Sequence, residues 1–166
     1  PGSGTAITDL SGNAINGTLT NGPTFNGGNA GTIDFDGLDD YIDFGSITST
    51  NPLSLYGLNE FTIEFWVNAD GTGDGYQRIT KNGDDYGFWM NGELKQTNTN
   101  TTTIPSTTTN CRIGSWNHST GRELNGNMAS FKIYNRALTS TEVVQNFTVK
   151  RTQFSIPISY ITATGG

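Results

Sequence analysis

The sequence predicts an all-β fold, an antiparallel β-sandwich with one short helix near the C-terminus. Several short segments alternate apolar and polar residues and end at turn-forming residues, as strands with one buried face do. The 9 Phe, 6 Tyr and 3 Trp gather in these runs, which favours a folded chain despite a hydrophobic content of only 33%. Only one segment carries the start signals of a helix, and 166 residues suffice for a single domain with its own core.

The clearest alternation lies in residues 61–68. One face carries Phe61, Ile63, Phe65 and Val67, and the other carries Thr62, Glu64, Trp66 and Asn68. Residues 31–36 alternate in the same way, with Ile33 and Phe35 on one face. Further strands are predicted at 41–44, 86–90, 93–96, 111–116 and 128–135.

Turn-forming residues separate these strands. Residues 37–40 (Gly-Leu-Asp-Asp) form a turn by composition, and Asn91-Gly92 is a strong hairpin signal. The polar, Thr-rich stretch 97–109 is predicted to be an exposed loop or an edge strand interrupted at Pro105.

The single predicted helix begins at a capping box. Thr139 and Glu142 have the spacing in which the hydroxyl and the carboxylate each accept a backbone N–H of the other residue. Val143, Val144 and Phe147 give the helix an apolar side. We therefore expect a helix of about two turns that covers an open end of the sandwich with these three side chains.

Composition excludes several classes of partner. Charged residues make up 14% of the chain and the formal net charge is -6, so nucleic acids and anionic membrane surfaces are poor partners. No apolar run is long enough to cross a bilayer, so membrane insertion is not expected. Cys111 is the only cysteine, and no internal disulfide can form.

Several motifs resemble those of laminin-G-like, concanavalin A-like jelly-roll domains. The resemblance spans roughly residues 9–150, and its most specific part is the closing stretch Phe-Lys-Ile-Tyr-Asn-Arg-Ala-Leu at 131–138, followed by Glu142. The other matching motifs are at 9–23, 32–42, 61–67, 90–92 and 112–114. The resemblance implies a jelly-roll sandwich.

Tyr-Asn-Arg-Ala-Leu at 134–138, followed by Gln-Asn-Phe at 145–147, is also similar to versions in virion proteins of marine, T4-like bacteriophages, which implies a virion or extracellular location. We expect residues 1–8 to be a linker, 9–150 the domain, and 151–166 a C-terminal extension that adds a strand or leads to a further domain. The sequence departs from the family in two places. The pair of middle strands before the hairpin is shortened, and Asn127 stands where many members have a calcium-binding Asp.

Outward-facing aromatic residues suggest a carbohydrate-binding site at Glu64, Trp66 and Trp89. Sugars stack their CH-rich faces on aromatic rings, while carboxylates bind their hydroxyl groups. The alternative is that both tryptophans pack under loops or against another subunit, because Trp is usually largely buried.

The densest group of carboxylates suggests a metal site at Asp34, Asp36, Asp39 and Asp40. Calcium takes several oxygen ligands from carboxylates and carbonyls, although this spacing does not match an EF-hand loop. The alternative is a polar strand face and a turn in which Asp side chains bind their own backbone. A structural calcium ion is thus compatible with the sequence, and no cofactor is required.

We expect no enzyme and assign no catalytic residue. Glu60 and Glu64 would lie about 13 Å apart along a strand, too far for a retaining glycosidase pair. The sequence favours a non-catalytic carbohydrate-binding or adhesion module whose partner is a glycan or cell-surface polysaccharide. The alternatives are a purely structural virion domain, such as a capsid decoration or tail-fibre component that binds other virion subunits, and a glycoside hydrolase.

Overall fold

A computed structural model describes residues 4–27, 31–58, 60–70, 86–90, 92–98, 110–115 and 123–153. In this part of the chain there are ten strands and one helix. Their bounds are β1 (Ala6–Ile7), β2 (Gly17–Thr20), β3 (Thr24–Asn26), β4 (Thr32–Asp36), β5 (Tyr41–Ser46), β6 (Thr62–Ala69), β7 (Tyr86–Met90), β8 (Glu93–Asn98), β9 (Asn110–Ile113), β10 (Asn125–Tyr134) and α1 (Ser140–Gln153).

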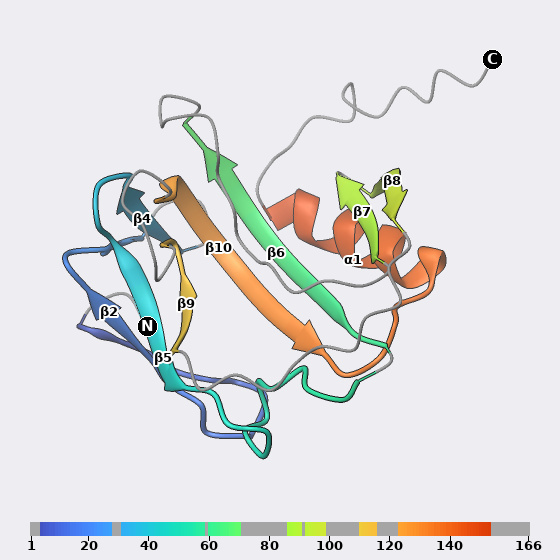
Figure 1. The fold of residues 1–166 in the computed structure, drawn as a ribbon. Helices are drawn as coiled ribbons and strands as arrows, with labels where there is room; N and C mark the ends of the chain where they lie inside the picture. The colour runs from blue at the N-terminus through green and yellow to red at the C-terminus, as the bar shows by residue number, and fades with distance from the viewer. Residues whose placement is uncertain are drawn as a thin grey trace.

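The strands form two four-stranded antiparallel sheets, which confirms the predicted β-sandwich (Figure 1). The first sheet has the order β1-β2-β5-β9 and the second the order β3-β4-β10-β6. Strands β7 and β8 form a separate hairpin that makes a two-stranded sheet of its own. Each sheet has one pair of consecutive strands, β1–β2 or β3–β4, and its other neighbours come from distant parts of the chain, as in a jelly roll.

The core lies between the two sheets. It consists of six buried apolar side chains, Leu19, Phe35, Ile42, Ile113, Leu124 and Met128. Phe35 on β4 is the most buried, with 1% of its surface exposed. Gly114 has a φ of 98°, and a Cβ there would lie 2.6 Å from Cε1 of Phe35, so this position needs glycine.

Strand β10 joins β4 to β6 and sets which side chains face outward. A register shift between Met128 and Ser130 places one extra residue in β10. The bulge keeps both halves of the strand in phase with β6. Beyond it, Phe131 pairs with Phe65, and Lys132 pairs with Glu64. Because neighbouring residues of a strand point to opposite faces, Lys132 and Glu64 share the outer face of this sheet.

The predicted strands at 31–36, 41–44, 61–68, 86–90 and 93–96 are confirmed, with small shifts of their ends. Strand 128–135 begins earlier, at Asn125, and β9 (110–113) overlaps the predicted strand 111–116 only at residues 111–113. Strands β1, β2 and β3 were not predicted, since two to four residues are too few to show alternation. Asn91 and residues 99–109 of the predicted loop lie outside the described residues.

Two expectations for the helix are wrong. It has 14 residues, Ser140–Gln153, rather than about two turns. Val144 is 46% exposed instead of buried. The helix lies alongside β6 over the outer face of the second sheet, not over an open end of the sandwich (Figure 1). Phe147 stacks on Trp66, and this contact joins the helix to the outer face of the second sheet.

The capping box at the start of α1 is confirmed. The backbone N–H of Glu142 donates to Oγ1 of Thr139 at 3.3 Å, and the N–H of Thr139 donates to Oε2 of Glu142 at 2.9 Å. Arg136 donates to both carboxylate oxygens of Glu142, at 2.9 and 2.6 Å. The bonds from Arg136 and from the Thr139 backbone lower the pKa of Glu142 from 4.5 to about 2.

Removing the guanidinium of Arg136 is expected to raise the pKa of Glu142 toward 4.5. Because the pKa of Glu142 is depressed in the folded state, its stabilising contribution is present above pH 4.5 and lost as the pH falls through about 2. An NMR titration of the Glu142 side-chain carboxyl in wild type and Arg136→Gln measures this directly. Equal midpoints in the two proteins would contradict the pairing, and Lys150→Gln at the far end of α1 is the control.

Candidate functional site

Two of the predicted carbohydrate-binding residues, Glu64 and Trp66, lie on the outer face of the second sheet. They are in β6, opposite Lys132 and Ser130 of β10. Thr62 and Tyr134 form the next pair along the same face. This face carries charged and hydroxyl groups beside its aromatic rings, and it differs from the apolar inner face that β6 and β10 turn to the core.

Helix α1 covers this face through two neighbouring residues. The ring of Phe147 stacks on that of Trp66 with centroids 5.5 Å apart and an angle of 4° between the planes. The side-chain amide of Asn146 donates to Oε2 of Glu64 at 2.7 Å. Such a ring pair contributes about 0.5–1.5 kcal/mol beyond the area it buries, and a hydrogen bond to a charged group about 1.5–3 kcal/mol.

Lys132 holds the other oxygen of Glu64. Its Nζ donates to Oε1 at 3.1 Å. Partial burial works to lower the pKa of Lys132, but the hydrogen bond and charge of Glu64 outweigh it, with help from Tyr134, and the pKa lies above its ordinary value. The pair is therefore neutral as a whole, and its carboxylate is fixed in orientation.

Gly92, just before the return strand of the β7–β8 hairpin, lies against the side chain of Phe147. A Cβ on Gly92 would be 2.9 Å from Cδ1 of Phe147, so this glycine allows the close approach. Trp89, the third predicted carbohydrate-binding residue, is in β7 and hence in the hairpin rather than in the sheet of Trp66. Its side chain lies outside the described residues.

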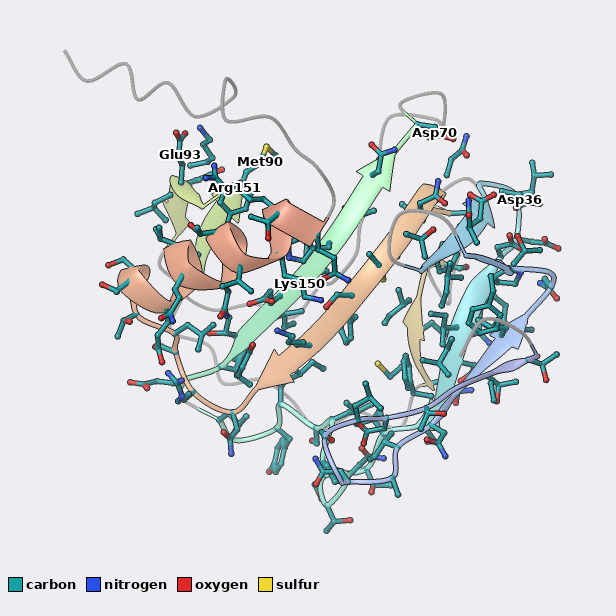
Figure 2. All side chains as sticks on the ribbon, turned by 180° about the vertical axis from the view of Figure 1, so that it is seen from behind. Asp36, Asp70, Met90, Glu93, Lys150 and Arg151 are labelled. Carbon is teal, nitrogen blue, oxygen red and sulfur yellow. The ribbon has the colours of Figure 1, made fainter. Side chains whose placement is uncertain are left out.

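The predicted metal-binding residues lie on β4, an interior strand of the same sheet, and in the turn that follows its C-terminal end. Asp36 ends β4, and Asp39 and Asp40 follow in the turn to β5. One carboxylate oxygen from each of these three lies within 4.8 Å of the others. Asp34 is exposed on β4, outside this group of three. Figure 2 shows Asp36 at the end of β4, well away from Met90 and Glu93 in the hairpin.

Asp40 is buried although its two partners are exposed. Only 3% of its surface is accessible. Its Oδ2 accepts the backbone N–H of Asp36 at 2.9 Å, while within the described part of the chain Oδ1 has no hydrogen-bond partner. Burial raises the pKa of Asp40, the Asp36 N–H works against this, and the charges of Asp36, Asp39 and Asp34 raise it further. A cation placed between the three carboxylates would relieve both the charge repulsion and the unpaired oxygen.

The two candidate sites are separate. Asp36 pairs with Asn125 and Trp66 pairs with Ser130, and five residues of β10 span about 16 Å. We call the turn that carries Asp36, Asp39 and Asp40 the acidic turn. A cation bound there would therefore not touch a ligand on Trp66.

Sequence reasoning missed the residues that surround Glu64 and Trp66. Lys132 follows from the register of β10, which the bulge at 129 hides in a single sequence. Asn146 and Phe147 belong to a helix whose contact with β6 spans about eighty residues of chain. The predicted apolar side of α1 was the only signal for Phe147.

The other sheet carries an aromatic residue on its outer face. The guanidinium of Arg112 lies 4.2 Å from the ring centre of Tyr41, and Nε of Arg112 is 3.5 Å from Oδ2 of Asp43. No helix of the described chain covers this surface, and it supplies a comparison for the Trp66 face.

Residues 79–144 match the model of a laminin G family described as the concanavalin A-like lectin/glucanases superfamily. The matched segment runs through β7 to β10 and ends in the first turn of α1. Searches of curated proteins and of solved structures gave no match. The match and the two antiparallel sheets agree on a concanavalin A-like β-sandwich. Among the described helices, none is long and apolar enough to cross a membrane.

Proposed function

We propose that this chain is a non-catalytic carbohydrate-binding or adhesion module whose binding face contains Trp66 and Glu64. The observation that supports it most is the pair of contacts on that face: a flat ring over Trp66, and an amide N–H to the Glu64 carboxylate. A pyranose makes the same two contacts through its CH face and a hydroxyl group. The match to a lectin and glucanase superfamily supports the same function.

The chemistry of the face favours a neutral sugar. Lys132 neutralises the charge of Glu64 and holds its Oε1. Oε2 is therefore a hydrogen-bond acceptor in a fixed position. The face thus has no net charge with which to attract an acidic sugar. Trp66 provides the apolar contact, and Glu64 accepts a sugar hydroxyl.

We further propose that Asp36, Asp39 and Asp40 hold a calcium ion, with the negative charge of Asp34 adding to the local potential. Asp40 is buried, and its Oδ1 has no hydrogen-bond partner among the described residues, which supports a ligand role for this carboxylate. Oxygen-only donors suit a hard cation. The ion would stabilise the β4–β5 turn and would take no part in sugar binding, since about 16 Å separates the two sites.

A purely structural role in a virion is the second candidate function. Large apolar side chains are exposed in the hairpin and on α1: Met90, Leu94, Val144 and Val149. Such side chains favour contact with another protein subunit. In either role we propose display on a virion or another extracellular particle, as the similarity of residues 134–138 and 145–147 to phage proteins implies.

Catalysis by a glycoside hydrolase would need two carboxylates facing one groove. Glu64, the carboxylate on the proposed face, is instead held by Lys132 and Asn146. This arrangement favours binding over catalysis.

Affinity electrophoresis tests the carbohydrate proposal. Purified chain is run in gels that contain soluble neutral β-glucan, galactomannan or acidic polygalacturonate. We expect a neutral polysaccharide to retard the wild type, and Trp66→Ala to weaken this binding about tenfold, because a lost stack of about 1.4 kcal/mol corresponds to that factor.

Tyr41→Ala, which removes a ring from the outer face of the other sheet, is the matched control and should bind like the wild type. Equal retardation of Trp66→Ala and the wild type would place the site elsewhere.

A further inference from the structure

We propose that helix α1 acts as a built-in competitor for the sugar-binding face, with Asn146 and Phe147 occupying the positions that a neutral pyranose would take. This inference rests on the proposed function and adds its regulation. Sugar binding at Trp66 would require α1 to move aside, and any condition that loosens α1 would strengthen binding.

The first support is the nature of the covered surface. Residues beneath a permanently docked helix are normally apolar, because apolar burial drives helix packing. Beneath α1 lie Glu64, Lys132 and Trp66, a charged pair and an indole. Such a surface stays soluble when it is uncovered, as a ligand-binding face must.

The second support is how few contacts hold the helix. None of its residues is buried, and Val149 is 65% exposed on its outward side. The helix meets β6 through the Phe147 ring and the Asn146 amide, and Gly92 of the hairpin also lies against Phe147. The β7–β8 hairpin forms no sheet with β6, so it can move together with the helix.

The third support is a fixed point at one end of α1. Oγ1 of Thr62 donates to the carbonyl oxygen of Arg136 at 3.0 Å and accepts the N–H of Leu138 at 2.9 Å. These bonds attach the segment before α1 to β6. Within the described part of the chain, α1 meets β6 further along through the Phe147 stack and the Asn146 hydrogen bond. The helix can therefore pivot at residues 136–139 and remain tethered.

Loss of the competing contacts should increase the fraction of molecules with an open face, and apparent affinity rises in proportion to that fraction. In neutral β-glucan and galactomannan gels, the full chain carrying Asn146→Ala and Phe147→Ala is expected to bind about tenfold more tightly than the wild type. Adding Trp66→Ala to this variant should abolish the gain. Val149→Ala, on the outward side of the helix, should behave like the wild type.

Asn146→Ala alone should give a smaller gain, and it decides the matter if the double variant does not fold. In the wild type, amide hydrogen exchange in α1 should accelerate when a retarding polysaccharide is added. If the wild type binds as tightly as these variants and exchange in α1 is unchanged, the competitor role is wrong while carbohydrate binding stands. If no variant binds any polysaccharide, both proposals fail.

Discussion

Replacing Phe35 with alanine is expected to lower the free energy of unfolding by about 3–5 kcal/mol. Phe35 is 1% exposed, at the centre of the cluster between the two sheets. Truncation would leave a cavity against Gly114, whose missing side chain makes room for the ring. Urea denaturation measures the loss as a lower midpoint at unchanged slope.

Phe25→Ala provides the control for Phe35. Phe25 is half-buried in β3, an edge strand, and packs against the same cluster. Its truncation should cost clearly less, because the site is more open to water. Equal losses in the two variants would mean that the core is not centred on Phe35. Since Phe35 lies between Asp34 and Asp36, its loss should also disorder the acidic turn.

Calcium is expected to raise the melting temperature of the wild type and to leave that of Asp40→Asn nearly unchanged. An ion that binds only the folded chain adds about 2.7 kcal/mol of stability at a concentration 100-fold above its dissociation constant. Differential scanning calorimetry with calcium and with a chelator measures the effect. Asp34→Asn should keep most of the calcium effect, because Asp34 lies outside the group of three carboxylates.

Without calcium, Asp40→Asn is expected to have the opposite effect on stability relative to the wild type. The asparagine oxygen can still accept the N–H of Asp36, and the unpaired, buried charge of Asp40 is removed. In chelator we therefore expect Asp40→Asn to be at least as stable as the wild type. A wild type that is clearly more stable than Asp40→Asn in chelator, and indifferent to calcium, would contradict a metal site.

The pH dependence should follow the raised pKa of Asp40. Its ordinary value is 3.8, and the folded chain holds the proton to a higher pH. Without calcium, the contribution of Asp40 to stability is present below pH 3.8 and lost as the pH rises through the folded pKa. Calcium competes with the proton, so the stabilisation by calcium should decrease as the pH falls through this range.

Local patterns predicted much of the fold and of the candidate sites. The alternation in residues 61–68 placed Glu64 and Trp66 together on the outer face of β6. Thr139 and Glu142 predicted the helix start, because a capping box depends on residues three apart. The turn that brings Asp36, Asp39 and Asp40 together likewise follows from neighbours in sequence.

Contacts between distant segments could not be predicted in this way. The stacking of Phe147 on Trp66 depends on where the helix packs, and the weak apolar side of α1 does not determine that. The burial of Asp40 depends on its position beside Gly22 and Gly114, which lie in other parts of the chain. The functional proposals depend on these two features, the stacking of Phe147 on Trp66 and the burial of Asp40.

Carbohydrate recognition is tested most directly with a broad printed glycan array, probed with the wild type and with the Asn146→Ala, Phe147→Ala variant, in calcium and again in chelator. We expect both proteins to bind neutral glycans, the variant more strongly, and binding to persist in chelator because the acidic turn lies about 16 Å from Trp66. An array with no bound glycan for either protein in either buffer would contradict the carbohydrate-binding function and favour a structural domain whose partner is another protein.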